Sequence, residues 1–327
     1  MKKFISLAAF SQAEDAAFEK NLPVNEVISP NGGDMEIVDM CKVKELYPKR
    51  SINGHKGTFG RLLLIVGSDR FMGAAQLSTL SALRSGVGIA SVISTNEAIR
   101  ALAISAKEAT FTRADTSSDG FIIASEENIA KIKQELEKAT AVLVGCGLGN
   151  TPDTVKILET VILNANCPII IDADGINALT SRIELLRTAK TEVVLTPHVG
   201  ELARLCDTDI NYAAKHRAEL AKSLSEKYGC TIVAKSSSTV IAGSAKMYLI
   251  AFGNDGLARG GSGDMLAGMI SSLIAQGVNA CDASVLGSAL MGLACEDLTQ
   301  THSTRGILAS DIINHLPLLF KKIERLE

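Results

Sequence analysis

The sequence predicts a layered α/β fold with a mainly parallel central sheet and an antiparallel edge. Three observations support this fold class. Short continuous apolar runs, which are typical of strands buried on both faces, recur along the chain. Segments with the apolar spacing of helices alternate with these runs. Three short runs separated by Ser- and Gly-containing turns then follow one another, which is typical of antiparallel strands.

The predicted elements follow in chain order from residue 61. The apolar run 61–66 ends in Gly67-Ser68 and predicts a strand, and the segment 73–85 has helical spacing and stops at Gly86. Further strands are predicted at 89–94, 141–145, 168–172 and 193–196, and helices follow the last three, the first of them beginning at Thr151-Pro152. The antiparallel edge is predicted at 231–235, 239–242 and 246–251, and two long helices at 263–276 and 280–298.

Composition narrows the class of protein. The chain has 327 residues, of which 46% are hydrophobic and 21% charged, which is an ordinary globular balance. A net charge of −3 and the absence of Trp argue against a nucleic-acid-binding surface. No apolar run reaches the roughly 18 residues of a membrane span. The seven cysteines are scattered without a C-x-x-C pair, which favours a reducing cytoplasm.

The N-terminal region is weakly patterned. We predict an N-terminal arm over residues 1–50, with a turn at Pro30-Asn31-Gly32-Gly33, and one domain over residues 51–327. Residues 1–13 leave two interpretations open, because Lys2 and Lys3 precede a short apolar stretch and small residues. They are either a short targeting signal or part of the arm.

Ligands of open α/β sheets bind beyond the carboxyl ends of the strands. Four predicted strand ends carry Gly, Asp or His, at 67–69, 145–150, 172–174 and 196–201. The glycines of 145–150 do not have the G-x-G-x-x-G spacing, so a dinucleotide dehydrogenase is disfavoured. The sequence also contains neither the G-x-x-x-x-G-K-[ST] nor the H-E-x-x-H motif.

The segment 253–268, GNDGLARGGSGDMLAG, is the strongest functional feature. Gly260, Gly261 and Gly263 allow the backbone to approach a ligand, and Asp264 stands where an apolar helix begins. Free amides and the helix dipole make such a helix start an anion site, and a carboxylate there is suited to act as a base during phosphoryl transfer. The alternative is that Ser262 or Asp264 only caps the helix, although a cap requires none of the three glycines.

The five residues from Gly260 to Asp264 resemble the G-G-[TS]-G-D signature of ADP/ATP-dependent NAD(P)H-hydrate dehydratases, which are ribokinase-like enzymes. Other segments resemble the family's motifs in the same order over roughly residues 50–320. They are His55-Lys56-Gly57 with Phe59-Gly60, Gly67-Ser68 with Met72 to Ala75, Gly145 to Gly149, Asp172-Ala173-Asp174, Thr196-Pro197-His198 with Gly200-Glu201, and Lys235 to Thr239. The chain departs from the family's usual residues at Cys146, Ser236, Asp255 and Arg259.

The resemblance implies a three-layer α/β/α fold with helices on both faces of the sheet. It implies a lyase that repairs the S epimer of hydrated NADH and NADPH, with ADP or ATP as co-substrate and Mg²⁺ as cofactor. The ring hydroxyl is phosphorylated and phosphate is then eliminated. It further implies a cytoplasmic homotetramer. Many members of the family carry an N-terminal epimerase domain. Only about 50 residues precede His55, too few for that domain, so we expect the epimerase to be a separate protein.

The resemblance also assigns roles to individual residues. Asp264 is the expected catalytic base and a substrate contact, and the amides of Gly261, Ser262 and Gly263 are the expected anion hole. The remaining expected substrate contacts are Ala74, Gly149 and His198. The expected nucleotide contacts are Lys235, Ser236, Ser237, Ser238, Thr239 and Gly263. No residue is assigned to the metal.

Several of these residues have simpler interpretations. Ala74 could be a packed helix residue, His198 a helix N-terminal residue bonded locally, and Lys235 a side chain that extends to solvent. Asp172 and Asp174 could bind a metal–water cluster or cap the following helix. Two other functions also stay open. One is a ribokinase-like kinase for a hydroxymethyl-pyrimidine or thiazole alcohol, and the other is a non-catalytic nucleotide sensor on the same fold.

Overall fold

The computed structural model describes residues 3–6, 10 and 34–325. The turn expected at Pro30 to Gly33 lies outside these residues, as does most of the segment 1–13.

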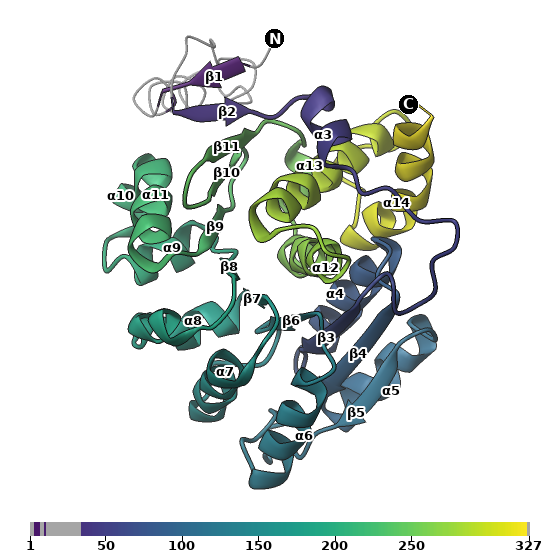
Figure 1. Cartoon of the computed structure of the whole chain (residues 1–327), viewed down its shortest axis with the longest axis vertical. Coiled ribbons are helices and arrows are strands. Elements are labelled where there is room, and N and C mark those ends of the chain that lie inside the picture. Colours follow the sequence, from purple (N-terminus) through teal and green to yellow (C-terminus); the bar gives the residue numbers. More distant parts are fainter. Residues whose placement is uncertain (1–2, 7–9, 11–33, 326–327) are drawn as a thin grey trace.

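One sheet of eleven strands runs through the described part of the chain (Figure 1). Its spatial order is β1-β2-β11-β10-β9-β8-β7-β6-β3-β4-β5. The strands are β1 (Lys3–Ile5), β2 (Met35–Ile37), β3 (Arg61–Ile65), β4 (Ile89–Ser94), β5 (Thr110–Arg113), β6 (Ala141–Val144), β7 (Ile169–Ile171), β8 (Val193–Leu195), β9 (Thr231–Ala234), β10 (Thr239–Ala242) and β11 (Met247–Ile250). From β9 to β5 every neighbouring pair is parallel, whereas β10 is antiparallel to both β9 and β11. The predicted parallel sheet with an antiparallel edge is therefore confirmed.

Helices cover both faces of the sheet, as expected (Figure 1). One face carries α3 (Met40–Leu46), α4 (Met72–Arg84), α5 (Asn96–Ser105), α12 (Ser262–Ala275), α13 (Ala280–Leu298) and α14 (Ala309–Glu324). The other carries α6 (Glu126–Leu136), α7 (Pro152–Asn164), α8 (Asp174–Thr180), α9 (Val199–Leu205) and α11 (Arg217–Tyr228), with α10 (Ile210–Lys215) packed on α9 and α11. Alternate residues of β3 enter the two cores, Leu62 and Leu64 on one side and Leu63 and Ile65 on the other, because successive strand side chains point to opposite faces.

Close packing holds α12 against α4. A Cβ atom on Gly268 would lie 2.2 Å from the Ser78 carbonyl oxygen of α4, so only glycine permits this approach. Every residue of α12 from Met265 to Ala275 is buried. The contact with α4 therefore fixes where the first turn of α12, which contains Asp264, meets the sheet.

Some elements were not anticipated from the sequence. The strand β2 pairs in parallel with β11, and Val43 of α3 is buried in the core, so residues 35–46 pack onto the sheet. Strands of three residues are too short to reveal a period. The boundary at residue 50 stays a prediction. Among the described helices, none combines the length and apolar character needed to cross a bilayer.

Candidate active site

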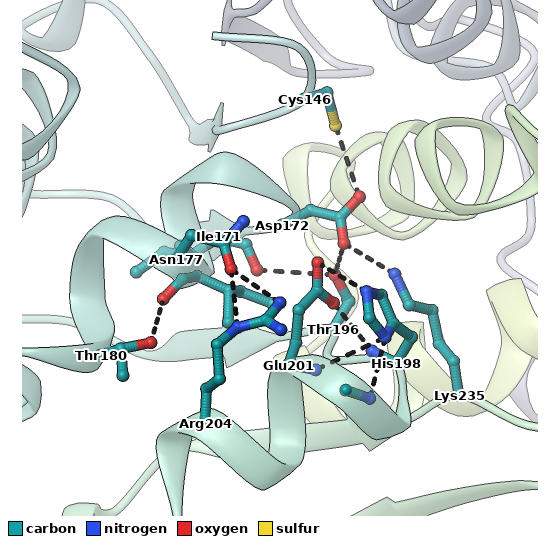
Figure 2. A network of polar contacts seen from close by, with 12 residues as sticks. Cys146, Ile171, Asp172, Asn177, Thr180, Thr196, His198, Glu201, Arg204 and Lys235 are labelled. Atoms are coloured by element: carbon teal, nitrogen blue, oxygen red, sulfur yellow. Dashed lines mark hydrogen bonds and ion pairs between the residues drawn. The ribbon is translucent and has the colours of Figure 1, made fainter. Parts of the chain in front are cut away.

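The carboxyl ends of β6, β7, β8 and β9 meet the first turn of α12. Asp172 lies at the centre of this region, directly after β7, and is only 1% exposed. Side chains from three neighbouring strand ends point to its carboxylate (Figure 2). Lys235 Nζ donates to Oδ1 at 2.8 Å, Thr196 Oγ1 donates to the same oxygen at 2.6 Å, and Cys146 Sγ lies 3.5 Å from Oδ2.

The Asp172–Lys235 pair is a buried salt bridge. Burial alone would favour a neutral carboxyl, but the Lys235 ammonium and the hydrogen bonds from Lys235, Thr196 and Cys146 outweigh it and lower the pKa of Asp172. The same contact raises the pKa of Lys235 against the effect of burial. The Lys235 side chain is 18% exposed, so the interpretation that it extends to solvent is wrong.

The backbone around Asp172 is tightly constrained. A Cβ atom on Gly145 (φ +129°) would lie 1.9 Å from the Asp172 carbonyl oxygen, so the Gly-rich loop after β6 can approach β7 only as glycine. The next residue, Ala173, has φ 50°, which is unusual for a residue with a side chain. Such strain clusters at functional sites.

Asp174 does not cap the helix that it begins, so that interpretation is wrong. The N-cap residue of α8 is Ala173, with no side-chain cap bond. Asp174 instead accepts a hydrogen bond from the Gly149 amide at 2.8 Å, so it holds the loop after β6.

The start of α12 is not closed by a side chain of its own. Its N-cap residue is Gly261, with φ +91° and no side-chain cap bond, so the interpretation of Ser262 or Asp264 as a cap is wrong. A Cβ atom on Gly261 would lie 2.3 Å from Leu77 Cδ1. The first amides of this 14-residue helix therefore lack a side-chain acceptor and can bind an anion.

Asp264 faces the buried cluster rather than bulk solvent. Its carboxylate, the Asp172 carboxylate and the Cys146 thiol each offer an atom within 4.8 Å of the others. Burial, and then the negative charge of Asp172, raise the pKa of Asp264 to about 6. A carboxylate with this pKa is ionised near neutral pH and is more basic than an ordinary aspartate, which suits a general base.

Two serines of the expected nucleotide and phosphate contacts have buried hydroxyls with no hydrogen-bond partner among the described residues. They are Ser238, in the loop between β9 and β10, and Ser262, in the first turn of α12. Buried hydroxyls are rarely left unpaired in folded proteins, so these two are candidate ligand donors. Ser236 and Ser237 of the same loop are exposed, and Thr239 begins β10.

His198 is the N-cap residue of α9. Its Nδ1 accepts hydrogen bonds from the amides of Gly200 at 3.0 Å and Glu201 at 3.4 Å, while the Glu201 carboxylate accepts the His198 amide at 2.8 Å. The interpretation of local hydrogen bonding is thus confirmed, and His198 Nε2 also lies 3.4 Å from Glu201 Oε1. Because Nδ1 accepts, the proton lies on Nε2, and burial together with Lys235 and Arg204 lowers the pKa of this half-exposed imidazole.

The other two expected substrate contacts border the loop after β6. Ala74, in the first turn of α4, lies so close to Gly147 that a Cβ atom there would be 2.8 Å from the Ala74 Cβ. Gly149 has φ +84°, and a Cβ atom on it would be 2.4 Å from the Phe121 ring. Ala74 is thus closely packed, and it lies at the edge of the Gly-rich loop.

The donors present do not form a dedicated magnesium site. Cys146, Asp172 and Asp264 are the one group of metal-ligand types found close together among the described residues. A thiol is a poor ligand for Mg²⁺, and Asp172 is already paired with Lys235. Mg²⁺ more often binds through nucleotide phosphates and water than in an all-protein cage.

Arg259 lies in the Gly-rich loop that precedes α12. Its guanidinium donates to the backbone carbonyls of Thr304 and Arg305. With Leu77, Gly260 and the start of α14 it lines a cavity of about 300 Å³. Arg259 is therefore tied to the segment before α14.

Sequence reasoning singled out Asp172 but did not foresee its partners. Thr196 and Glu201 were recognised only as parts of a motif, and both are buried members of the network. The signal that could have found them is their position at a strand end, where polar residues in an otherwise apolar sheet need partners.

The fold and this site define a ribokinase-like α/β protein. A hydroxyethylthiazole kinase from Pyrococcus horikoshii shares the fold at 14% identity, with a TM-score of 0.55 over 85% of this chain and 91% of that one. A family model for NAD(P)H-hydrate dehydratase matches residues 62–318, and the chain belongs to this family.

Individual relatives agree with this assignment. The ADP-dependent (S)-NAD(P)H-hydrate dehydratase of Bacillus subtilis is 36% identical over 86% of this chain and 96% of its own length. The crystal structure of the ADP/ATP-dependent enzyme from Bacillus subtilis, co-crystallised with ATP/Mg²⁺, superposes with a TM-score of 0.75 at 32% identity, over 87% of this chain and 97% of that one. A bifunctional NAD(P)H-hydrate repair enzyme from Moorella thermoacetica is 30% identical over 85% of this chain, which spans 52% of that protein.

Proposed function

We propose that the chain dehydrates hydrated NADH and NADPH, using ADP or ATP as phosphoryl donor. The observation that carries the proposal is the uncapped start of α12, where Asp264 faces a buried cluster instead of closing its own helix. The family membership and the names of the Bacillus subtilis relatives support the same substrates.

The proposed reaction has two steps. In the first, the ring hydroxyl of the hydrate attacks the terminal phosphorus of the nucleotide, its proton passes to Asp264, and the phosphorus–oxygen bond to the nucleotide breaks. In the second, the lone pair of the ring nitrogen expels phosphate, and loss of a neighbouring ring proton restores the double bond. Phosphorylation is needed because hydroxide is a poor leaving group. The protein contributes positioning and electrostatic stabilisation to such a transfer.

The proposed roles follow the positions in the site. The amides of Gly261, Ser262 and Gly263 would hold the transferred phosphoryl group. Residues Lys235 to Thr239 would bind the nucleotide, and the unpartnered Ser238 and Ser262 hydroxyls support that placement. The substrate would contact Ala74, Gly149 and the half-exposed imidazole of His198.

We also propose the wider setting of the enzyme. Mg²⁺ would enter as the nucleotide complex, since the described side chains do not offer a magnesium cage. The catalytic unit would be residues 51–327 in a cytoplasmic homotetramer, with residues 1–50 as an arm. An epimerase activity would supply the S form, in keeping with the bifunctional repair enzymes among the relatives. Light scattering on purified protein tests the tetramer.

The direct test is a repair assay. Purified protein with Mg²⁺ and either ADP or ATP should restore NADH absorbance from the S hydrate, whereas omission of nucleotide should abolish recovery. Running the two nucleotides and both hydrates in parallel identifies the preferred pair. No recovery with any pair would contradict the proposal, and a stable phosphorylated product without NADH would indicate a small-molecule kinase.

A further inference from the structure

Asp172 has no role in the reaction described above, yet its carboxylate contacts the side chains of Cys146, Thr196 and Lys235 (Figure 2). Its carboxylate binds side chains from the ends of β6, β8 and β9. Its backbone is fixed as well, because its amide donates to the Val144 carbonyl and its own carbonyl accepts the Gly175 amide. The Asp172 carboxylate is therefore held in one position.

The pairing with Asp172 places the Lys235 ammonium at the start of α12. A Cβ atom on Gly263 would lie 3.2 Å from Lys235 Nζ and 3.9 Å from Asp172 Oδ2. The ammonium therefore adjoins the first turn, whose amides carry the positive end of the helix dipole. A full positive charge at this point strengthens an anion site, and its position depends on the carboxylate that holds it.

Four ionisable groups face Asp264. Two carboxylates, Asp172 after β7 and Asp174 of α8, disfavour its ionisation. The Lys235 ammonium and the Cys146 thiol favour it. Of these groups, Asp172 has the largest effect after burial itself. The charge on Asp172 therefore makes Asp264 a stronger base.

We infer that Asp172 is a positioning residue for phosphoryl transfer, which holds the Lys235 ammonium at the first turn of α12 and places a second negative charge beside Asp264. The first role, which is to hold the Lys235 ammonium, concerns nucleotide binding and does not depend on which molecule accepts the phosphoryl group. The second role, which is to place a charge beside Asp264, rests on the proposed function. The two roles depend on different properties of the side chain, namely its hydrogen bonds and its charge.

The main test is Asp172→Asn, which keeps the shape and an acceptor oxygen but removes the charge. Asp264 then loses a like-charged neighbour, and Lys235 loses its counter-ion, so both changes lower the pKa of Asp264. In the pH profile of kcat/KM, we expect activity in the wild type to fall on the acid side near pH 6, as Asp264 becomes protonated. This acid limb of the profile should move to lower pH by about one unit in the variant. The Kd for MgATP should rise about tenfold as the ammonium loses its charged partner.

Two further variants separate the roles. Thr196→Val is nearly isosteric and removes the 2.6 Å hydrogen bond to Asp172, together with a long 3.5 Å contact to the Ile171 carbonyl. It should weaken MgATP binding by about threefold to tenfold and leave the acid limb in place, because the charge is retained. Cys146→Ala removes the thiol that favours ionised Asp264, so it should move the acid limb to higher pH, opposite to Asp172→Asn.

Asp297→Asn is the matched control, since it neutralises an ion-paired carboxylate between α13 and α14. It should change neither the acid limb nor the Kd for MgATP.

Calorimetric binding of MgATP distinguishes failure of this inference from failure of the proposed function. If the wild type restores no NADH, the proposed function and the second role are both wrong, while the Kd values of Asp172→Asn and Thr196→Val still decide the first role. Unchanged Kd values overturn the first role. A folded Asp172→Asn variant with an unmoved acid limb overturns the second. Should Asp172→Asn fail to fold, Asp172→Ser, which also removes the charge, decides the second role, and Thr196→Val decides the first.

Discussion

Helices α9 and α12 both begin at the same edge of the sheet, but their first turns are built differently. The start of α9 is closed by its own side chains, because His198 accepts the amides of Gly200 and Glu201 and Glu201 accepts the amide of His198. The start of α12 has glycine at the N-cap and no side-chain acceptor. Its one carboxylate, Asp264, faces Asp172 and Cys146 instead.

The difference distinguishes a helix start that stabilises the fold from one that is available to a ligand. A capping box satisfies the free amides of α9 and contributes about 1 kcal/mol to stability. In α12 no side chain accepts the corresponding amides, and the shape of the turn comes from glycine and from packing on Leu77.

Asp264→Asn tests whether Asp264, at the start of α12, is the catalytic base. Asparagine retains the shape of the side chain but cannot accept the proton, so we expect kcat to fall by about 10²–10⁴. The variant should still bind MgATP, which calorimetry measures. Normal turnover would mean that Asp264 is not the base.

Gly261→Ala should damage both the turn and the anion site. Alanine at φ +91° is strained by about 1–3 kcal/mol, and its Cβ would meet Leu77 at 2.3 Å. We expect a lower Tm and a loss of MgATP affinity of about tenfold or more. Gly260→Ala is the matched control, because no atom lies within 4 Å of its added Cβ and its backbone is not left-handed. Equal effects of the two substitutions would contradict a specific role for Gly261.

Substitutions of His198 separate the cap from the proposed substrate contact. His198→Ala should lose both, with a destabilisation of about 1 kcal/mol and a higher KM for the hydrate. His198→Asn keeps a good N-cap residue but lacks the Nε2–H donor, so its Tm should stay near that of the wild type while the KM for the hydrate rises. A change in nucleotide affinity larger than the change in hydrate KM would refute the substrate role.

Glu201→Gln should mainly alter the dependence of stability on pH. Burial raises the pKa of Glu201 in the folded protein to about 7, above its ordinary value of 4.5. The folded state therefore binds this proton more tightly than the unfolded state, and the resulting stability is present below pH 4.5 and is lost as pH rises through about 7. Glutamine removes this loss, so the Tm of the variant relative to the wild type should rise between pH 5 and pH 8. A parallel pH dependence in both proteins would show that Glu201 is not the group responsible.

Much of the fold was predictable because strong local patterns produced it. The apolar runs of β3, β4 and β6 and the helices α4, α12 and α13 appear within one residue of their predicted bounds. The short strands β1 and β2 were not predicted, since three residues carry too little pattern and their position depends on pairing with one another and with β11. Their place in the sheet is a consequence of tertiary contacts.

For the candidate site, the sequence predicts where the residues stand but not what they contact. Strand ends and helix starts can be located because glycines, aspartates and histidines interrupt otherwise apolar patterns there. The contacts of those residues follow from the folded chain. Lys235 is paired rather than solvated, Asp174 binds the Gly149 amide rather than its own helix, and Asp264 faces Asp172. These contacts join segments that are far apart in the chain. Burial, hydrogen bonding and charge interactions between such segments depend on distances that only folding sets.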